Sequence, residues 1–300
     1  MKHYESVIIG HISEDNNIDH EGNAMTICGG AVLFSSASAA ALGHKVAAVT
    51  RLSEKDFDRL SQFTIDKDDI YVIASEKSTT MRNQYFTADK ERRLSSCLSV
   101  GSPFTADDLD NLGIDGDIYH FAGLVYGDFP NELIKKCAKS GKIAVDVQTC
   151  LRHVNPEDGS MYFEDWADKK EMLPYIYFLK TDAAEAEIMT GLTDRLEAAK
   201  MLHSWGAKEI LITHNTEVLA YDGENAYTCP IRARNLSGRT GRGDTTFAAY
   251  INERLQKGIP ESLLNATAIV SLKMETPGVF KGTREDVENY KREFYPDYLK

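Results

Sequence analysis

The chain has 300 residues, of which 42% are hydrophobic and 27% are charged. A chain of this length can bury roughly three-quarters of its unfolded surface, which excludes a disordered or fibrous protein. A net charge of −12 disfavours nucleic acid and anionic membranes as partners. The five cysteines show no metal-ligand spacing and no run of 18 apolar residues occurs, so we expect a cytoplasmic protein with reduced thiols.

Strand and helix patterns alternate along most of the chain. A short apolar run over 6–10 predicts a buried first strand, and the small residues between Gly29 and Gly43 predict a helix packed closely on a sheet. Such alternation indicates one α/β domain over 1–300, with a mostly parallel central sheet covered by helices. Further strands are expected at 46–50, 118–121, 143–147, 175–180 and 210–213, and further helices at 131–140 and 196–205.

Two stretches interrupt this alternation and predict a small β flap, or lid, beside the main sheet. Residues 11–28 are polar, and residues 70–100 alternate about a turn at 88–90, which is typical of antiparallel strands. An edge extension without function is the alternative. Because exposed strand edges can pair across a twofold axis, the lid also suggests a homodimer.

The most informative segment is a glycine-rich loop late in the chain. The sequence GRTGRGD at 238–244 precedes apolar residues at helical spacing, so a helix is expected to begin near Asp244. Backbone N–H groups and the positive end of the helix dipole would then face an anion such as phosphate. Asp244 either caps this helix or accepts a proton from a hydroxyl that attacks a phosphoryl group.

Two other nucleotide-dependent classes are disfavoured by their missing motifs. No G-x-G-x-x-G follows the first strand, which argues against a dinucleotide-dependent oxidoreductase. The Walker A pattern G-x-x-x-x-G-K-[ST] is also absent.

The loop, the early Gly29-Gly30 pair and a central acidic pair together resemble the PfkB or ribokinase-type carbohydrate kinases, over roughly 7–280. The resemblance implies a ribokinase-like three-layer α/β fold and transfer of a phosphoryl group from ATP, with Mg²⁺, to a hydroxyl of a small sugar or polyol. A nucleoside is the alternative substrate. A ligand-binding regulator that kept the fold but lost efficient catalysis is the alternative function. The residues that the resemblance assigns to catalysis are Asp244, as general base, and Gly241, Arg242 and Gly243, whose amides would hold the transferred phosphate.

On the nucleotide side the match is less close. Asp182 and Glu185 resemble the family's N-x-x-E motif, in which Glu185 would reach Mg²⁺ through water; a solvated acidic helix start is the alternative. Thr213 and Asn215 stand where the family continues into T-x-G-x-x-G beneath the nucleotide. Residues 266–268 and Lys273 lie where the family closes the adenine pocket, or else they pack within a helix.

The basic loop itself departs from the family pattern. Many members carry Asp where this chain has Gly238, and Arg242 replaces a usual alanine. We define the arginine loop as residues 232–243, which hold four arginines and no acid. Arg242, with Arg239 on the other side of the loop, would therefore bring guanidinium groups to the phosphate site and neutralise developing charge.

On the substrate side, carboxylate, amide and close backbone groups are expected to hold sugar hydroxyls. Asp19 competes with Asp15 for the carboxylate role. Arg82 and Asn83 are expected to point into the site from the flap, as flap residues of the family do, and exposed polar residues without function are the alternative. Phe34 replaces an asparagine that the family often carries, which suggests a different polyol or an apolar wall against the ring. The predicted substrate contacts are Asp15, Gly29, Gly30, Asn83, Gln148 and Arg152.

Overall fold

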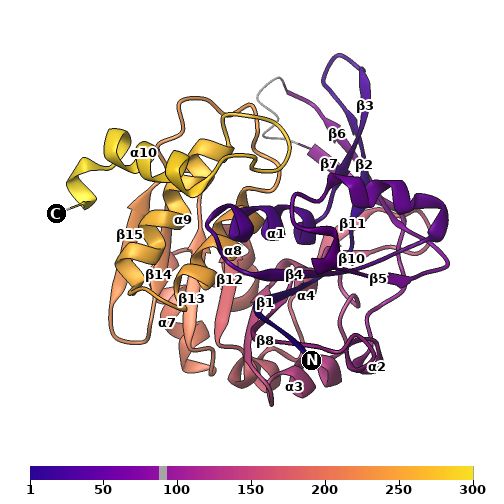
Figure 1. Cartoon of the computed structure of the whole chain (residues 1–300), viewed down its shortest axis with the longest axis horizontal. Coiled ribbons are helices and arrows are strands. Elements are labelled where there is room, and N and C mark those ends of the chain that lie inside the picture. The colour runs from indigo at the N-terminus through magenta and orange to yellow at the C-terminus, as the bar shows by residue number, and fades with distance from the viewer. Residues whose placement is uncertain (88–92, 300) are drawn as a thin grey trace.

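The computed structural model describes residues 1–87 and 93–299, so the predicted turn at 88–90 lies outside the described residues. Its central element is a nine-stranded sheet (Figure 1). In order across the sheet, the strands are β15 (Ala226–Pro230), β14 (Glu217–Tyr221), β13 (Glu209–Thr213), β12 (Phe178–Asp182), β9 (Lys142–Asp146), β8 (Ile114–Phe121), β1 (Lys2–Ile9), β4 (Val46–Leu52) and β5 (Ile70–Ala74).

The strands from β13 to β5 run parallel, and β14 and β15 are added antiparallel at one edge. Successive residues of a strand point to opposite faces, so a parallel strand covered on both faces is apolar throughout. In β1, Val7 and Ile9 pack into one core and Ile8 packs into another on the opposite face. The predicted mostly parallel sheet is therefore confirmed.

Helices cover both faces of this sheet and complete three layers. One core contains side chains of α3, α6 and α7, whereas the cores on the other face contain those of α1, α8 and α9. Among the described residues, no helix is both long and apolar enough to cross a membrane. The helices are α1 (Ala31–Ala41), α2 (Ala106–Asp110), α3 (Asn131–Cys137), α4 (Gln148–Leu151), α5 (Lys169–Met172), α6 (Ala183–Thr190), α7 (Arg195–Ser204), α8 (Arg242–Glu253), α9 (Ile259–Lys273) and α10 (Arg284–Phe294).

A second, four-stranded sheet projects from one side of the main sheet, at the upper right of Figure 1, and forms the lid. Its order is β3 (Ala24–Gly29), β2 (Ser13–Ile18), β6 (Thr79–Tyr85) and β7 (Arg93–Ser99). The prediction was wrong for residues 70–74, which pair with β4 in the main sheet. A short β-branched strand fits either sheet, and only its partner decides between them. A small hairpin of β10 (Arg152–Val154) and β11 (Met161–Phe163) lies beside β7.

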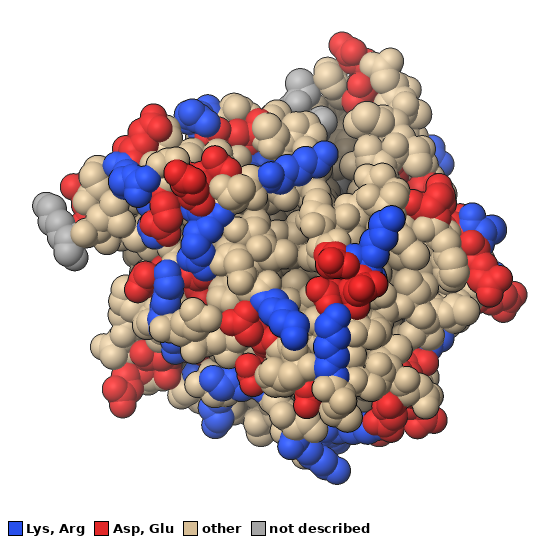
Figure 2. All heavy atoms as spheres, in the orientation of Figure 1, with Lys and Arg blue, Asp and Glu red and all other residues tan. Residues whose placement is uncertain are grey.

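Helices α1 and α8 lie in direct contact along small side chains. The Ser38 hydroxyl donates a hydrogen bond of 2.8 Å to the Thr245 carbonyl, and the Ser35 hydroxyl donates one of 3.4 Å to the Asp244 carbonyl. This contact brings the start of α1, which follows the Gly29-Gly30 pair, close to the start of α8. Figure 2 shows acidic and basic side chains interspersed over one face of the molecule, without one large field of either sign.

Candidate active site

The site is built around the first turn of α8. Gly241 precedes the helix in a left-handed conformation, with a φ of 78°, and the helix begins at Arg242. Asp244 therefore lies within the first turn, and no side chain caps this helix, so Asp244 is not its N-cap. The capping alternative is wrong for this residue.

The backbone amides differ in part from the predicted phosphate hole. The N–H of Arg242 donates to the Arg239 carbonyl at 3.2 Å, so this amide is engaged within the loop. The N–H groups of Gly243 and Asp244 lie in the first helical turn, which offers them no carbonyl four residues earlier within the helix. They are the donors that an anion at this helix start would meet.

Phe34 lies beneath the turn that starts α8. A Cβ added to Gly241 would come within 2.3 Å of the Phe34 ring, and the ring itself is buried. The expectation that Phe34 forms a wall against the substrate is therefore wrong, because its ring supports Gly241 from below. Both the positive φ and the close ring require glycine at this position.

Buried charges surround Asp244. Burial, together with the charge of Asp146, raises the pKa of Asp244 to about 6, against the opposing charges of Lys180, Arg152 and Lys273. A carboxyl with this pKa is largely ionised at pH 7 and still basic enough to accept a proton, which suits a general base.

Lys180 lies at the centre of these charges. The sequence patterns did not predict it as a site residue. Its Nζ lies 2.9 Å from Oδ2 of Asp146 and 3.7 Å from Oε2 of Glu185. A Cβ added to Gly243 would lie 3.1 Å from the same Nζ, so the ammonium sits directly under the first turn of α8. Part of the signal for this pair was available, because Lys180 ends the strand expected at 175–180 and Asp146 lies near the end of the one expected at 143–147; the structure pairs the two residues directly.

Asp182 and Glu185 form a reciprocal cap on α6. The Glu185 N–H donates to Oδ1 of Asp182, the Asp182 N–H donates to Oε2 of Glu185, and both distances are 2.8 Å. Glu185 is buried, so the solvated alternative is wrong; burial raises the pKa of Glu185 above its usual range.

These carboxylates do not make a metal site by themselves. Both are engaged in the cap, and the Lys180 ammonium lies beside Glu185. No group of three or more His, Cys, Asp or Glu side chains suited to a metal occurs in 1–87 or 93–299. Direct ligation by Glu185 would compete with the Asp182 N–H and the Lys180 ammonium, so contact with Mg²⁺ through water is the arrangement that these residues allow.

The arginine loop and the end of β13 meet at Asn215. Oδ1 of Asn215 accepts a hydrogen bond of 2.8 Å from Arg242 and one of 3.4 Å from Arg239. Thr213, by contrast, is buried within β13. Residues 266–268 are buried within α9, so the packing interpretation describes them better than an adenine pocket does.

Two of the predicted acceptor contacts, Asp15 and Asn83, lie on the buried face of the lid. Oδ1 of Asp15 accepts from the Ser13 hydroxyl at 2.7 Å, and a Cβ added to Gly29 would collide with the Asp15 carboxylate. Asn17 lies two residues after Asp15 on the same face of β2. Its side-chain oxygen accepts a hydrogen bond of 3.1 Å from the Asn83 side chain. The Asn83 side chain also accepts from the Ser95 hydroxyl at 2.7 Å.

Asp19 and Arg82 lie elsewhere than on this face. Asp19 accepts hydrogen bonds from Asn23 in the exposed turn between β2 and β3, which leaves Asp15 as the buried carboxylate. Arg82 is exposed on the face of β6 opposite to Asn83.

Gly30, Gln148 and Arg152 complete the predicted acceptor side. Gly30 has a φ of 107°, and an added Cβ would lie 2.3 Å from the His11 carbonyl oxygen, so only glycine fits here. The Arg152 guanidinium donates to the Gln148 side chain. Because Arg152 also lowers the pKa of Asp244, its charge acts on the centre of the site.

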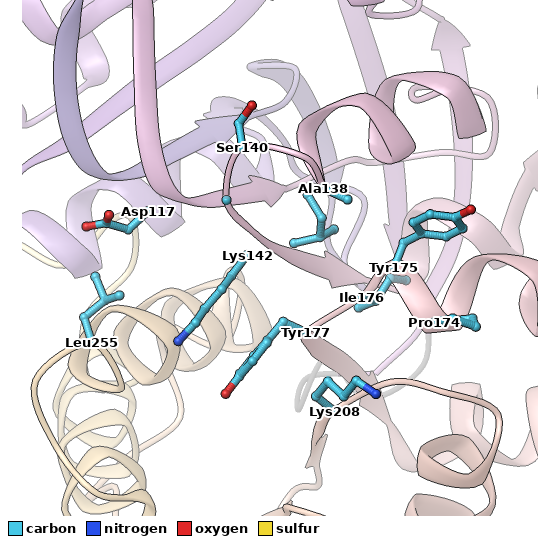
Figure 3. Close-up of a pocket in the computed structure, with 12 residues that line it drawn as sticks. Asp117, Ala138, Ser140, Lys142, Pro174, Tyr175, Ile176, Tyr177, Lys208 and Leu255 are labelled. Carbon is cyan, nitrogen blue, oxygen red and sulfur yellow. The ribbon is translucent and has the colours of Figure 1, made fainter.

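A cavity of about 590 Å³ lies at the opposite end of the main sheet. Figure 3 shows Lys142 and Tyr177 extending from the amino ends of β9 and β12, with Lys208 before β13. Asp146, Asp182 and Thr213 mark the other ends of the same three strands. The predicted site residues do not line this cavity, and they gather where parallel sheets usually bind ligands.

Comparisons with known proteins agree with this arrangement. Residues 7–285 match the model of the pfkB family of carbohydrate kinases. A cytidine kinase from Thermococcus kodakarensis is 25% identical over 253 residues, which cover 82% of this chain and 86% of that protein.

Two similar solved structures cover nearly the whole chain. A pyrophosphate-dependent kinase of the ribokinase family, solved with a pyrophosphate analog and myo-inositol, is 33% identical with a TM-score of 0.84 and covers 95% of this chain and 99% of its own. A pyrophosphate-dependent myo-inositol-1 kinase that two substitutions convert into a myo-inositol-3 kinase is 31% identical with a TM-score of 0.83, covering 97% of this chain and 99% of its own. The chain thus belongs to the pfkB family of carbohydrate kinases and is a phosphotransferase with the ribokinase-like fold.

Proposed function

We propose that this kinase phosphorylates a hydroxyl of a cyclic polyol of the inositol class, with inorganic pyrophosphate as the phosphoryl donor. The observation that carries the proposal is the position of Asp244, a buried carboxylate in the first turn of α8 directly after the arginine loop. A base and an anion-binding helix start at one point are what phosphoryl transfer to an alcohol requires.

Asp244 is the proposed general base. As the substrate oxygen attacks phosphorus, its proton passes to the Asp244 carboxylate. The bond between phosphorus and the bridging oxygen of the donor breaks, and inorganic phosphate leaves with the electron pair. The N–H groups of Gly243 and Asp244 and the helix dipole stabilise the negative charge on the transferred group.

Two features of the donor side favour pyrophosphate over ATP. Arg239 and Arg242 converge on Asn215. Their planar guanidinium groups suit the oxygens of a phosphate. Thr213 and residues 266–268, the expected contacts of a nucleoside, are buried in β13 and α9. The two solved structures described above are of pyrophosphate-dependent kinases, which supports the same choice.

The lid supports a polyol acceptor. Asp15 offers a carboxylate, and Asn17, Asn83 and Ser95 offer neutral donors and acceptors that match vicinal hydroxyls. In the myo-inositol-1 kinase, changing one asparagine and one serine to leucine changes the phosphorylated hydroxyl. The Asn83–Ser95 pair supplies the same two side-chain types on the lid of this chain.

Magnesium has no step in this proposal. When present, Mg²⁺ supplies charge neutralisation to phosphates. We expect it to enter as a complex with the donor, because the buried carboxylates are occupied by Lys180 and by the cap of α6.

A matrix of donors and acceptors tests the proposal. Purified protein is incubated with MgCl₂ and either pyrophosphate or ATP, and with myo-inositol, ribose, fructose or cytidine, and products are followed by ³¹P NMR. Asp244→Asn protein is the matched control for contaminating kinases.

We expect a polyol phosphate with pyrophosphate and little product with ATP. Turnover with ATP alone would overturn the donor assignment. Phosphorylation of cytidine in preference to polyols would favour the nucleoside alternative. The absence of turnover with every pair, combined with measurable ligand binding, would favour the regulator.

A further inference from the structure

The arginine loop is docked on the end of α9 by several backbone contacts. The Gly238 N–H donates to the Met274 carbonyl at 2.7 Å, and the Ser237 hydroxyl donates to the Glu275 carbonyl at 2.7 Å. Arg234 donates from Nε to both Glu275 carboxylate oxygens, at 2.8 and 2.9 Å. The loop therefore has a fixed support before any ligand binds.

Lys273, the last residue of α9, extends from this support beneath the loop. Its side chain is buried, with 1% of its surface exposed. Nζ donates to the Gly238 carbonyl at 2.6 Å and also to the Thr240 carbonyl. Nζ also lies 5.1 Å from the centre of the Phe34 ring, which supports Gly241. One ammonium thus holds two peptide groups of the loop.

These two hydrogen bonds determine where the next amides point. In a planar trans peptide, the carbonyl of one residue and the N–H of the following residue point in opposite directions. Holding the carbonyls of Gly238 and Thr240 on Lys273 turns the N–H groups of Arg239 and Gly241 away from it. It also keeps two negative carbonyl oxygens from turning toward an incoming phosphate.

Gly238 allows the close docking. A Cβ at this position would lie 1.9 Å from the Thr276 carbonyl oxygen and 3.0 Å from that of Lys273. Any side chain would therefore lift the loop from α9. This gives a physical reason why the aspartate expected from the family resemblance is absent here.

We propose that Lys273 is a positioning residue for the phosphoryl donor, which fixes the arginine loop in its anion-binding conformation, and that Gly238 is the position that makes this docking possible. The inference rests on the proposed function, in which the loop binds the donor phosphates. Lys273 acts through the backbone of the loop, and Asp244 remains the proposed base.

Two variants that disturb the docking by different means test this inference. Lys273→Met removes the ammonium and keeps much of the apolar stem, whereas Gly238→Ala keeps the ammonium and adds one methyl group. Lys139→Met, at an exposed lysine after α3, is the matched control. Isothermal titration with inorganic pyrophosphate and with MgATP measures donor binding without turnover, and steady-state kinetics give KM for donor and acceptor separately.

We expect both variants to weaken binding of the donor by about 10-fold or more, because Lys273→Met removes the charged hydrogen bonds that hold the loop and Gly238→Ala lifts the loop from α9. The acceptor KM should stay within about twofold, since it depends on the lid, and the control should match wild type. A merely structural role would lower stability without separating the two KM values.

The outcomes separate this inference from the proposed function. If wild type binds neither donor, the proposed function fails and the positioning role fails with it. If wild type binds a donor and both variants bind it equally well, only the positioning role is overturned. Should Lys273→Met lack a cooperative thermal transition, Gly238→Ala decides the question on its own.

Discussion

The two sides of the candidate site offer different chemistry to a ligand. The arginine loop meets Asn215 with two guanidinium groups, which are fixed positive charges. The lid presents Asp15 together with amide and hydroxyl groups that are hydrogen-bonded to one another. One side is suited to the charge of a phosphate and the other to the pattern of hydroxyls on a neutral ring.

This difference teaches how the molecule can separate affinity from selectivity. Guanidinium contacts to phosphate are strong and tolerate the rest of the donor, whereas neutral hydrogen bonds are weaker and depend on where each hydroxyl lies. Changes on the donor side should therefore affect donor binding strongly. Changes on the lid should affect the choice and orientation of the acceptor.

The largest effect is expected where the two sides meet. Asp244→Asn should lower kcat by about 10²–10⁴-fold, because the amide cannot accept the proton of the attacking hydroxyl. Isothermal titration should still detect both ligands at near wild-type affinity. Retention of more than a tenth of the wild-type kcat would contradict the assignment of Asp244 as the base.

Arg242→Ala should break the donor side alone. Loss of a charged hydrogen-bond donor should raise the donor KM and lower turnover by about 10–100-fold, with the thermal midpoint nearly unchanged. The acceptor KM should not move. Arg292→Ala, on the exposed face of α10, is the matched arginine control. Wild-type turnover in Arg242→Ala would exclude a role for this guanidinium.

Asn83→Leu should change the acceptor side alone. Loss of neutral hydrogen bonds of about 0.5–1.5 kcal/mol each should raise the acceptor KM by about 2–10-fold, and NMR of the product should reveal phosphate on a second hydroxyl. Arg82→Leu changes the adjacent residue on the opposite face of β6 and serves as control. An equal effect on donor KM would show that the two sides are not separate.

The smallest expected effect is a change in pH dependence. With a pKa of about 6, Asp244 must lose its proton to act as base, so kcat should fall as pH decreases through about 6. The negative charge of Asp146 raises the pKa of Asp244 directly. Asp146 also pairs with Lys180, whose positive charge lowers the pKa of Asp244. Asp146→Asn should therefore move the acidic limb of the pH–kcat profile to lower pH, by less than about one unit. An upward shift would contradict this coupling.

Local patterns in the sequence predicted the main elements of the fold. Short apolar runs marked β1, β4, β9 and β13, and small residues followed by glycine marked α1. The assignment of β5 to the lid failed because the choice of sheet depends on a distant partner, β4, that no local pattern records.

The sequence also placed the first turn of α8 correctly and missed what supports it. Asp244 and the loop stand together in the chain, so one motif predicted them. Lys180 lies 64 residues before Asp244 and reaches the loop from β12. Lys273 lies 29 residues after Asp244 and reaches the loop from the end of α9. Phe34 was misinterpreted for the same reason, because its neighbour Gly241 is distant in sequence.

The hydrogen bond from Ser38 on α1 to the Thr245 carbonyl on α8 has a consequence for natural variation and engineering. A bulkier residue on this face of α1 would displace the first turn of α8, although α1 itself touches neither proposed ligand through Ser38. Screens for altered turnover should therefore recover substitutions in α1, and measurements of thermal stability alone would overlook some of them.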